Sequence, residues 1–145
     1  MGDALKHTKP LIVIVTKKDL WGPLLSESVP AQQSLVTTRS GLTALNVEAI
    51  EDHSRKVRKL LNETTPEIVE AAENFAESVT FIGVSALGKM PKKMGESSLW
   101  GIEPDAIQPD GVTLPMLLSF HLRLPGSIPV ASRQPRSTVS ARESA

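Results

Sequence analysis

The sequence predicts an α/β fold in which a partial, doubly wound parallel sheet is flanked by helices. Two short apolar runs, at residues 11–15 and 79–84, carry this prediction, and the five residues of the first run are all apolar. Such a run without alternation is typical of a strand buried on both faces of a parallel sheet. Between the runs, apolar residues recur at helical spacing, which supplies the crossover that parallel strands require.

Three amphipathic helices are expected around these strands. The first begins after Asn46, a favourable N-cap residue, and its apolar positions are Val47, Ile50, Val57, Leu60 and Leu61. The second begins near Pro66, which is tolerated in a first turn, and its apolar face is Ile68, Val69, Ala72, Phe75 and Ala76. The third spans 114–124 behind a Thr113 cap, and its apolar surface is Leu114, Leu117, Leu118, Phe120 and Leu122.

The remaining segments are less regular. Residues 23–45 predict a loop in which 34–38 is the one extended candidate, and residues 90–111 predict an irregular segment. Trp100 in that segment is expected to be either a packing anchor or an exposed contact. We therefore divide the chain into a lead-in at 1–8, a domain at 9–124 and a tail at 125–145. The tail is rich in Pro, Ser and Arg, which predicts disorder.

Composition excludes several classes of function. Sixteen basic and sixteen acidic side chains cancel, so neither nucleic acid nor an anionic membrane is an expected partner. Without cysteine there is no disulfide or thiolate chemistry, and His7, His53 and His121 lack the spacing of a zinc site. Ser85 does not lie in the G-x-S-x-G motif of serine hydrolases. No signal-peptide core or bilayer-length apolar run is present, and we expect a cytoplasmic protein.

A four-residue turn directly follows the first strand run. Its sequence, Thr16-Lys17-Lys18-Asp19, resembles the guanine-specificity motif of the P-loop GTPases, Asn/Thr-Lys-x-Asp. The resemblance implies that Asp19 accepts hydrogen bonds from the ring N–H and the exocyclic amine of guanine. It also implies that the Lys17 stem lies along the base and that Thr16 braces neighbouring loops. Ligands bind beyond the carboxyl ends of parallel strands, where this turn is expected.

A second motif directly follows the other strand run. Ser85-Ala86-Leu87 resembles the Ser-Ala-Lys/Leu loop of the same family. There the N–H of the alanine contacts the guanine carbonyl, so the resemblance implies a main-chain role for Ala86 and a turn-shaping role for Ser85. The 65 residues between Asp19 and Ser85 exceed the usual length in small GTPases. Larger relatives that carry inserts, of the translation-factor class, are the better comparison.

The phosphate-binding part of that family is not matched. Residues 83–90 follow G-x-x-x-x-G-K, but Met90 replaces the magnesium-binding hydroxyl and Pro91 follows, so we interpret the match as chance. The resemblance covers the carboxyl-terminal half of a GTPase domain only, and the chain begins shortly before the first strand. We therefore expect GTP or GDP as ligand, Mg²⁺ only through nucleotide phosphates, and no catalysis by this chain alone.

Two partner hypotheses accompany this half-domain. A two-stranded sheet leaves its edges unpaired, so we expect the chain to associate with a complementary amino-terminal half, with another protein partner, or with itself. The alternative function is a non-enzymatic interaction scaffold derived from an α/β nucleotide-binding fold.

Overall fold

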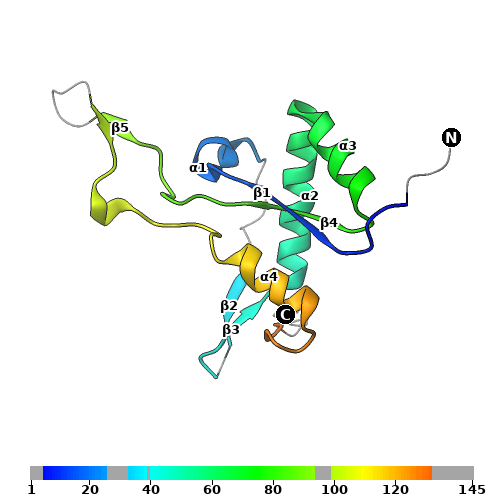
Figure 1. Cartoon of the computed structure of the whole chain (residues 1–145). Coiled ribbons are helices and arrows are strands. Elements are labelled where there is room, and N and C mark those ends of the chain that lie inside the picture. Colours follow the sequence, from blue (N-terminus) through cyan, green and yellow to red (C-terminus); the bar gives the residue numbers. More distant parts are fainter. Residues whose placement is uncertain (1–4, 26–32, 39, 94–98, 132–145) are drawn as a thin grey trace, which may run out of the picture.

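Two parallel strands lie at the centre of the structure, a computed structural model that describes residues 5–25, 33–38, 40–93 and 99–131 (Figure 1). β1 (Leu11–Val15) pairs with β4 (Val79–Gly83), with Leu11 opposite Val79 and Val15 opposite Gly83. Both strand predictions are thereby confirmed. The fold is mixed α/β, with a small parallel sheet between helices.

Two helices cover one face of this sheet (Figure 1). α2 (Val47–Thr64) begins as predicted, because the Asn46 side chain accepts a 3.2 Å hydrogen bond from the Ala49 N–H. α3 (Pro66–Phe75) follows directly and returns the chain to β4. The buried residues of this layer are Val57, Leu61, Val69, Ala72 and Phe81. Burial of a side chain of the size of Phe81 contributes about 2 to 3 kcal/mol.

The apolar face of α3 is narrower than predicted. Val69, Ala72 and Ala76 are buried, whereas Ile68 and Phe75 are exposed. Each residue advances about 100° around a helix, so Ile68 and Phe75 lie off the buried stripe. The Phe75 ring stacks on His7, with 5.3 Å between ring centroids.

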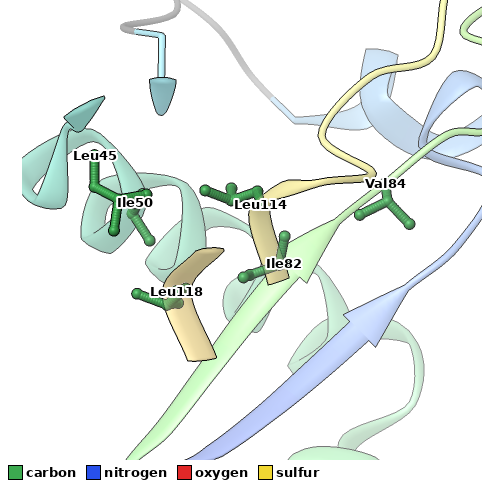
Figure 2. Packing of buried hydrophobic residues seen from close by; sticks show 6 residues of the cluster. All are labelled: Leu45, Ile50, Ile82, Val84, Leu114 and Leu118. Atoms are coloured by element: carbon green, nitrogen blue, oxygen red, sulfur yellow. The ribbon is translucent and has the colours of Figure 1, made fainter. Parts of the chain in front are cut away.

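α4 (Leu114–Arg123) lies across the opposite face of the sheet. Figure 2 shows how Leu114 and Leu118 meet Ile82 and Val84 of the β4 segment, and how Leu45 and Ile50 complete the cluster. The helix prediction is confirmed, but the Thr113 side chain makes no capping hydrogen bond because this residue is itself in the helical conformation. Phe120 and Leu122, expected in the apolar surface, are exposed.

A small hairpin extends this second core. β2 (Leu35–Thr37) confirms the extended candidate, and it pairs with β3 (Thr43–Leu45), which lay in the predicted loop. Leu45 also binds the chain after α4: its N–H donates to the Pro129 carbonyl, and its carbonyl accepts from the Ala131 N–H, both at 2.8 Å. The predicted disorder is therefore wrong for residues 125–131, where Ile128 packs against the core. Residues 132–145 lie outside the described residues.

A long arm leaves the carboxyl end of β4 and returns before α4 (Figure 1). It contains two short paired strands, β5 (Lys92–Lys93) and β6 (Trp100–Gly101), and a 3-10 turn, η2 (Pro104–Ala106). Trp100 is 72% exposed, so it is not a packing anchor within the described part of the chain, and a contact with a partner stays a prediction. No helix within the described ranges is both long and apolar enough to cross a membrane.

Candidate functional site

The loops that follow β1 and β4 lie side by side, because the two strands are parallel neighbours and end at the same edge of the sheet. The Val84 N–H donates to the Val15 carbonyl at 2.9 Å, and the Lys18 N–H donates to the Val84 carbonyl at 3.0 Å. After Thr16 the chain forms α1 (Lys18–Trp21), a single helical turn that continues into η1 (Gly22–Leu24). Asp19 is thus held in a helical turn, at the position where the sequence predicted a turn.

One side-chain hydrogen bond joins the two loops. The Ser85 hydroxyl donates to Asp19 Oδ1 at 2.5 Å and accepts from the Gly88 N–H at 2.8 Å. Ser85 is 2% exposed, and it is the one buried polar or charged residue in the described ranges. Because its single hydroxyl proton is directed at Asp19, Ser85 orients that carboxylate. Asp19 Oδ2 makes no hydrogen bond to any described residue, so it can accept from a ligand.

The turn before Asp19 has an unusual backbone. Lys17 has φ 57° and ψ 40°, and no other non-glycine residue of the described chain has a positive φ. The left-handed conformation costs about 1 to 2 kcal/mol for a residue with a Cβ. Trp21 supports the turn, since its indole N–H donates to the Thr16 carbonyl at 2.7 Å. Strained backbone of this kind concentrates at functional sites.

The returning end of the arm closes the other side of the site. Ser85 and Asp110 exchange two backbone hydrogen bonds, of 2.9 and 2.8 Å, and the Gln108 N–H donates to the Leu87 carbonyl at 3.0 Å. At these bonds the start and the end of the arm cross, and the backbone of Gly88 packs directly against Gln108. Gly88 has φ +70°, and a Cβ there would lie 1.7 Å from the Gln108 carbonyl oxygen. The Lys18 ammonium forms a 2.7 Å ion pair with Asp110. The ion pair therefore links the turn after β1 to the end of the arm that leads into α4.

Together these groups line an open cavity of about 550 Å³. Its lining combines two carboxylates, an ammonium group and the Ser85 hydroxyl with a short apolar wall; the residues are Lys18, Asp19, Gly22, Pro23, Leu25, Ser85, Gly88 and Asp110. A volume of this order accommodates a small planar ligand. The carboxylates favour a ligand that presents N–H donors, because they can only accept hydrogen bonds.

The residues predicted from the two motifs do not all line this cavity. Asp19 and Ser85 do, whereas Thr16 and Lys17 are exposed and contribute no lining atoms. Ala86 and Leu87 are also exposed, and the Ala86 N–H makes no hydrogen bond to another described residue. Lys89, which follows Gly88, is exposed too. In the described part of the chain β5 follows it, whereas a phosphate-binding loop would open a helix.

Sequence reasoning missed three contributors to the site. Lys18 occupied the unspecified position of the first motif, Asp110 lay in a segment without periodicity, and Trp21 was not considered. The Asp110-Gly111 pair is a common turn signal, and Gly111 does have φ +70°. That signal could have placed a turn at residue 110, but nothing local indicated that the turn lies beside Lys18.

The histidines give no metal site. Among the described residues there is no group of three or more His, Asp or Glu side chains positioned to hold a metal ion. His53 instead binds the protein backbone, since its Nε2 accepts from the Gly83 N–H at 3.2 Å. This bond fixes α2 against the carboxyl end of β4.

Comparison of the chain with models of known protein families, with curated proteins and with solved structures gives no match. The functional interpretation therefore depends on the two motifs and on the geometry that surrounds them.

Proposed function

We propose that this chain is a guanine-recognition element related to GTPase domains, and that it is incomplete with respect to phosphate binding and catalysis. The single observation that carries this proposal is the hydrogen bond from Ser85 to Asp19. It joins the two motifs that the sequence singled out, across the carboxyl edge of adjacent parallel strands. Adjacent parallel strands bring the two loops together, and this bond adds a direct side-chain contact between one residue of each motif.

The chemistry of the proposed contact follows from the free acceptor atoms. Guanine presents a ring N–H and an exocyclic amine side by side, and a carboxylate can accept from both. Adenine lacks this pair of donors, so it would leave the carboxylate unpaired, which disfavours binding. The N–H of Ala86 donates to no other described residue, and it is the donor that we assign to the guanine carbonyl oxygen.

Base contacts alone would bind weakly. Guanine has about eleven heavy atoms, and at about 0.3 kcal/mol per atom it contributes roughly 3 kcal/mol, less than the 4.1 kcal/mol of millimolar binding. The cavity lining contains one ammonium group, and Asp110 already neutralises it. We therefore propose that GTP or GDP, with Mg²⁺ held through the phosphates, binds only when a complementary segment or partner supplies phosphate contacts.

A titration of the chain itself tests the base contact without phosphates. Amide chemical shifts are followed by NMR while guanosine, adenosine or xanthosine is added to millimolar concentration. We expect guanosine to shift the amides of Lys17, Asp19 and Ala86, and adenosine to leave them unchanged.

The matched variant is Asp19→Asn. Its amide presents one donor and one acceptor, which fits the N–H and carbonyl of xanthine better than the two donors of guanine. We therefore expect the Asp19→Asn variant to bind xanthosine in preference to guanosine. Two results would contradict a role for Asp19 in base recognition: equal shifts with guanosine and adenosine, or an unchanged response to guanosine in Asp19→Asn. Either result would favour the interaction scaffold as the function of the chain.

The scaffold alternative also has an observation in its favour. The face of the sheet that carries α4 includes an apolar groove of about 660 Å³ beside β1, which the nucleotide proposal does not use.

A further inference from the structure

The outer edge of β1 presents unpaired backbone groups. The Leu11 N–H donates to the Ser78 carbonyl, and the Val15 carbonyl accepts from the Val84 N–H. In a parallel pair, alternate residues direct both of their backbone groups to the same neighbour. Leu11, Val13 and Val15 therefore face β4, and Ile12 and Ile14 face away from it. Within the described chain no strand pairs with that side of β1.

One backbone group is unavailable at each end of this free edge: Pro10 has no N–H to offer, and the Thr16 carbonyl already accepts from Trp21. The residues that offer both an N–H and a carbonyl are therefore only Ile12 and Ile14. An edge of this length does not support an extended run of added strands.

An apolar groove runs along the same edge. Its eight lining residues include no charged side chain; they are Pro10, Ile12, Ile14, Val84, Val112, Pro115, Met116 and Ser119. Three of them are large apolar residues that remain open to solvent, since Ile14 is 50%, Val112 46% and Met116 57% exposed. Phe120, one helical turn beyond Met116, is 46% exposed.

We propose that this edge and groove form the interface of a two-fold symmetric dimer between two copies of the chain. In an antiparallel arrangement centred on Val13, Ile12 of one copy lies opposite Ile14 of the other, and the reverse pair is identical. Each such pair exchanges two N–H···O bonds, so the free N–H and carbonyl groups of Ile12 and Ile14 are all paired. The result is a four-stranded sheet with β4 at both outer edges, and an interface of this kind is closed.

The exposed apolar surface is close to what a standard interface contains. Ile14, Val112, Met116 and Phe120 together expose on the order of 400 Å² per copy, and a standard interface buries about 800 Å² per partner, somewhat more than half of it apolar. The two-fold axis brings both copies of Ile14 and Met116 to one face of the joined sheet. The largest apolar patch of a typical monomer is of this size and is often functional.

Dimerisation of this kind does not depend on guanine recognition. Asp19 and Ser85 follow the carboxyl ends of their strands, so the antiparallel dimer places the two candidate sites at opposite ends of the joined sheet. Lys9 of each copy would lie opposite Lys17 of the other copy, at the ends of the paired strands. We therefore expect added salt to strengthen association, because it screens these like charges.

Sedimentation velocity of the full chain, from about 1 to about 200 µM, tests the dimer. We expect a monomer–dimer equilibrium with a dissociation constant on the order of micromolar and no larger species. Hydrogen exchange on the same samples should show the Ile12 and Ile14 amides becoming protected as the dimer forms, while the Val13 and Val15 amides are protected throughout.

Two variants and one control locate the interface. Met116→Lys places a charge in the patch on α4, and Ile14→Pro removes one edge donor without altering the ladder to β4, since proline is tolerated at a strand edge. Each should weaken dimerisation at least tenfold. Ile68→Lys changes an exposed isoleucine on α3, across the sheet, and should leave dimerisation unchanged.

A monomer at every concentration overturns the proposal, and so does a series of larger oligomers. A dimer that survives both Met116→Lys and Ile14→Pro, or one that leaves the Ile12 and Ile14 amides unprotected, also overturns it.

Discussion

The buried Ser85 hydroxyl lies 2.5 Å from Asp19 Oδ1 and joins residues that are 66 positions apart in the sequence. The contact exists because both residues directly follow strands that are parallel neighbours. Its direction matters as well: the hydroxyl donates to the carboxylate and accepts from the Gly88 N–H. One side chain thus positions the carboxylate after β1 and shapes the turn after β4.

Replacement of this hydroxyl should destabilise the fold. Ser85→Ala leaves the Gly88 N–H and Asp19 Oδ1 without their partner, and loss of a buried hydrogen bond to a charged group costs about 2 kcal/mol. Urea unfolding, read from the transition midpoint, measures the change. Ser119→Ala is the matched control, because the Ser119 hydroxyl is exposed and donates only to the Pro115 carbonyl of its own helix. Equal losses in the two variants would argue against a structural role for the Asp19–Ser85 contact.

Gly83 at the end of β4 provides the space that Trp21 occupies. A Cβ at position 83 would lie 2.3 Å from the Cη2 atom of Trp21. We expect Gly83→Ala to displace the indole, break its hydrogen bond to Thr16 and cost about 1 to 3 kcal/mol. In a Trp100→Phe background only Trp21 emits, since the chain has two tryptophans, and its fluorescence should shift to longer wavelength.

Gly22→Ala is the control for that experiment. A Cβ at position 22 meets Lys18 Cγ at 3.6 Å, an ordinary contact, and the residue has a helical φ of −51°. It should therefore leave both stability and Trp21 emission close to those of the parent chain. An unshifted Trp21 spectrum in Gly83→Ala would show that the indole does not depend on this glycine.

The crossing of the arm at Gly88 allows a second matched comparison. Gly88 and Gly41 both have positive φ, +70° and +79°, but a Cβ at Gly41 meets nothing within 4 Å. Gly41→Ala should lower the free energy of unfolding by about 1 to 2 kcal/mol, which is the cost of the left-handed conformation for a residue with a Cβ. Gly88→Ala should lower the free energy of unfolding by at least about 1 kcal/mol more, because the Gln108 backbone has to move. Faster exchange of the Gln108 amide would report release of the crossing, and similar losses in both variants would contradict the close approach.

The main elements could be predicted because their patterns are local. Apolar runs indicated β1 and β4, and apolar spacing with the Asn46 cap indicated α2. The hairpin of β2 and β3 was only half predicted, since Thr43–Leu45 follows Ser40 and Gly41, which indicate a loop. Its burial comes from contacts with Ile50 and α4 that no local pattern reports. The pairing of Leu45 with Pro129 and Ala131 is likewise long-range, so composition suggested disorder there.

The candidate site was predictable to a similar extent. The motifs singled out Asp19 and Ser85 in advance, and the parallel register brings them into contact. Lys18 and Asp110 could not be paired from the sequence, because the arm between Ser85 and Asp110 has no periodicity and its return depends on backbone bonds at both ends. Thr16 and Lys17 were placed by analogy, and the structure leaves both side chains outside the cavity lining.

The ion pair between α2 and α3 should make stability depend on pH. Arg58 donates to Glu73 through Nε and Nη2, and these hydrogen bonds lower the pKa of the Glu73 carboxyl. A lowered folded-state pKa means that the stabilisation is complete above about pH 5 and is lost as pH falls through the lowered pKa. Because both side chains are partly exposed, we expect Glu73→Gln to cost only about 0.5 kcal/mol at pH 7, and less as pH falls toward the lowered pKa.

Urea unfolding at several pH values measures this dependence. Glu63→Gln is the control, since Lys59 lies 4.0 Å from Glu63 on the exposed side of α2. A cost for Glu73→Gln that does not change with pH would mean that the carboxylate charge contributes nothing.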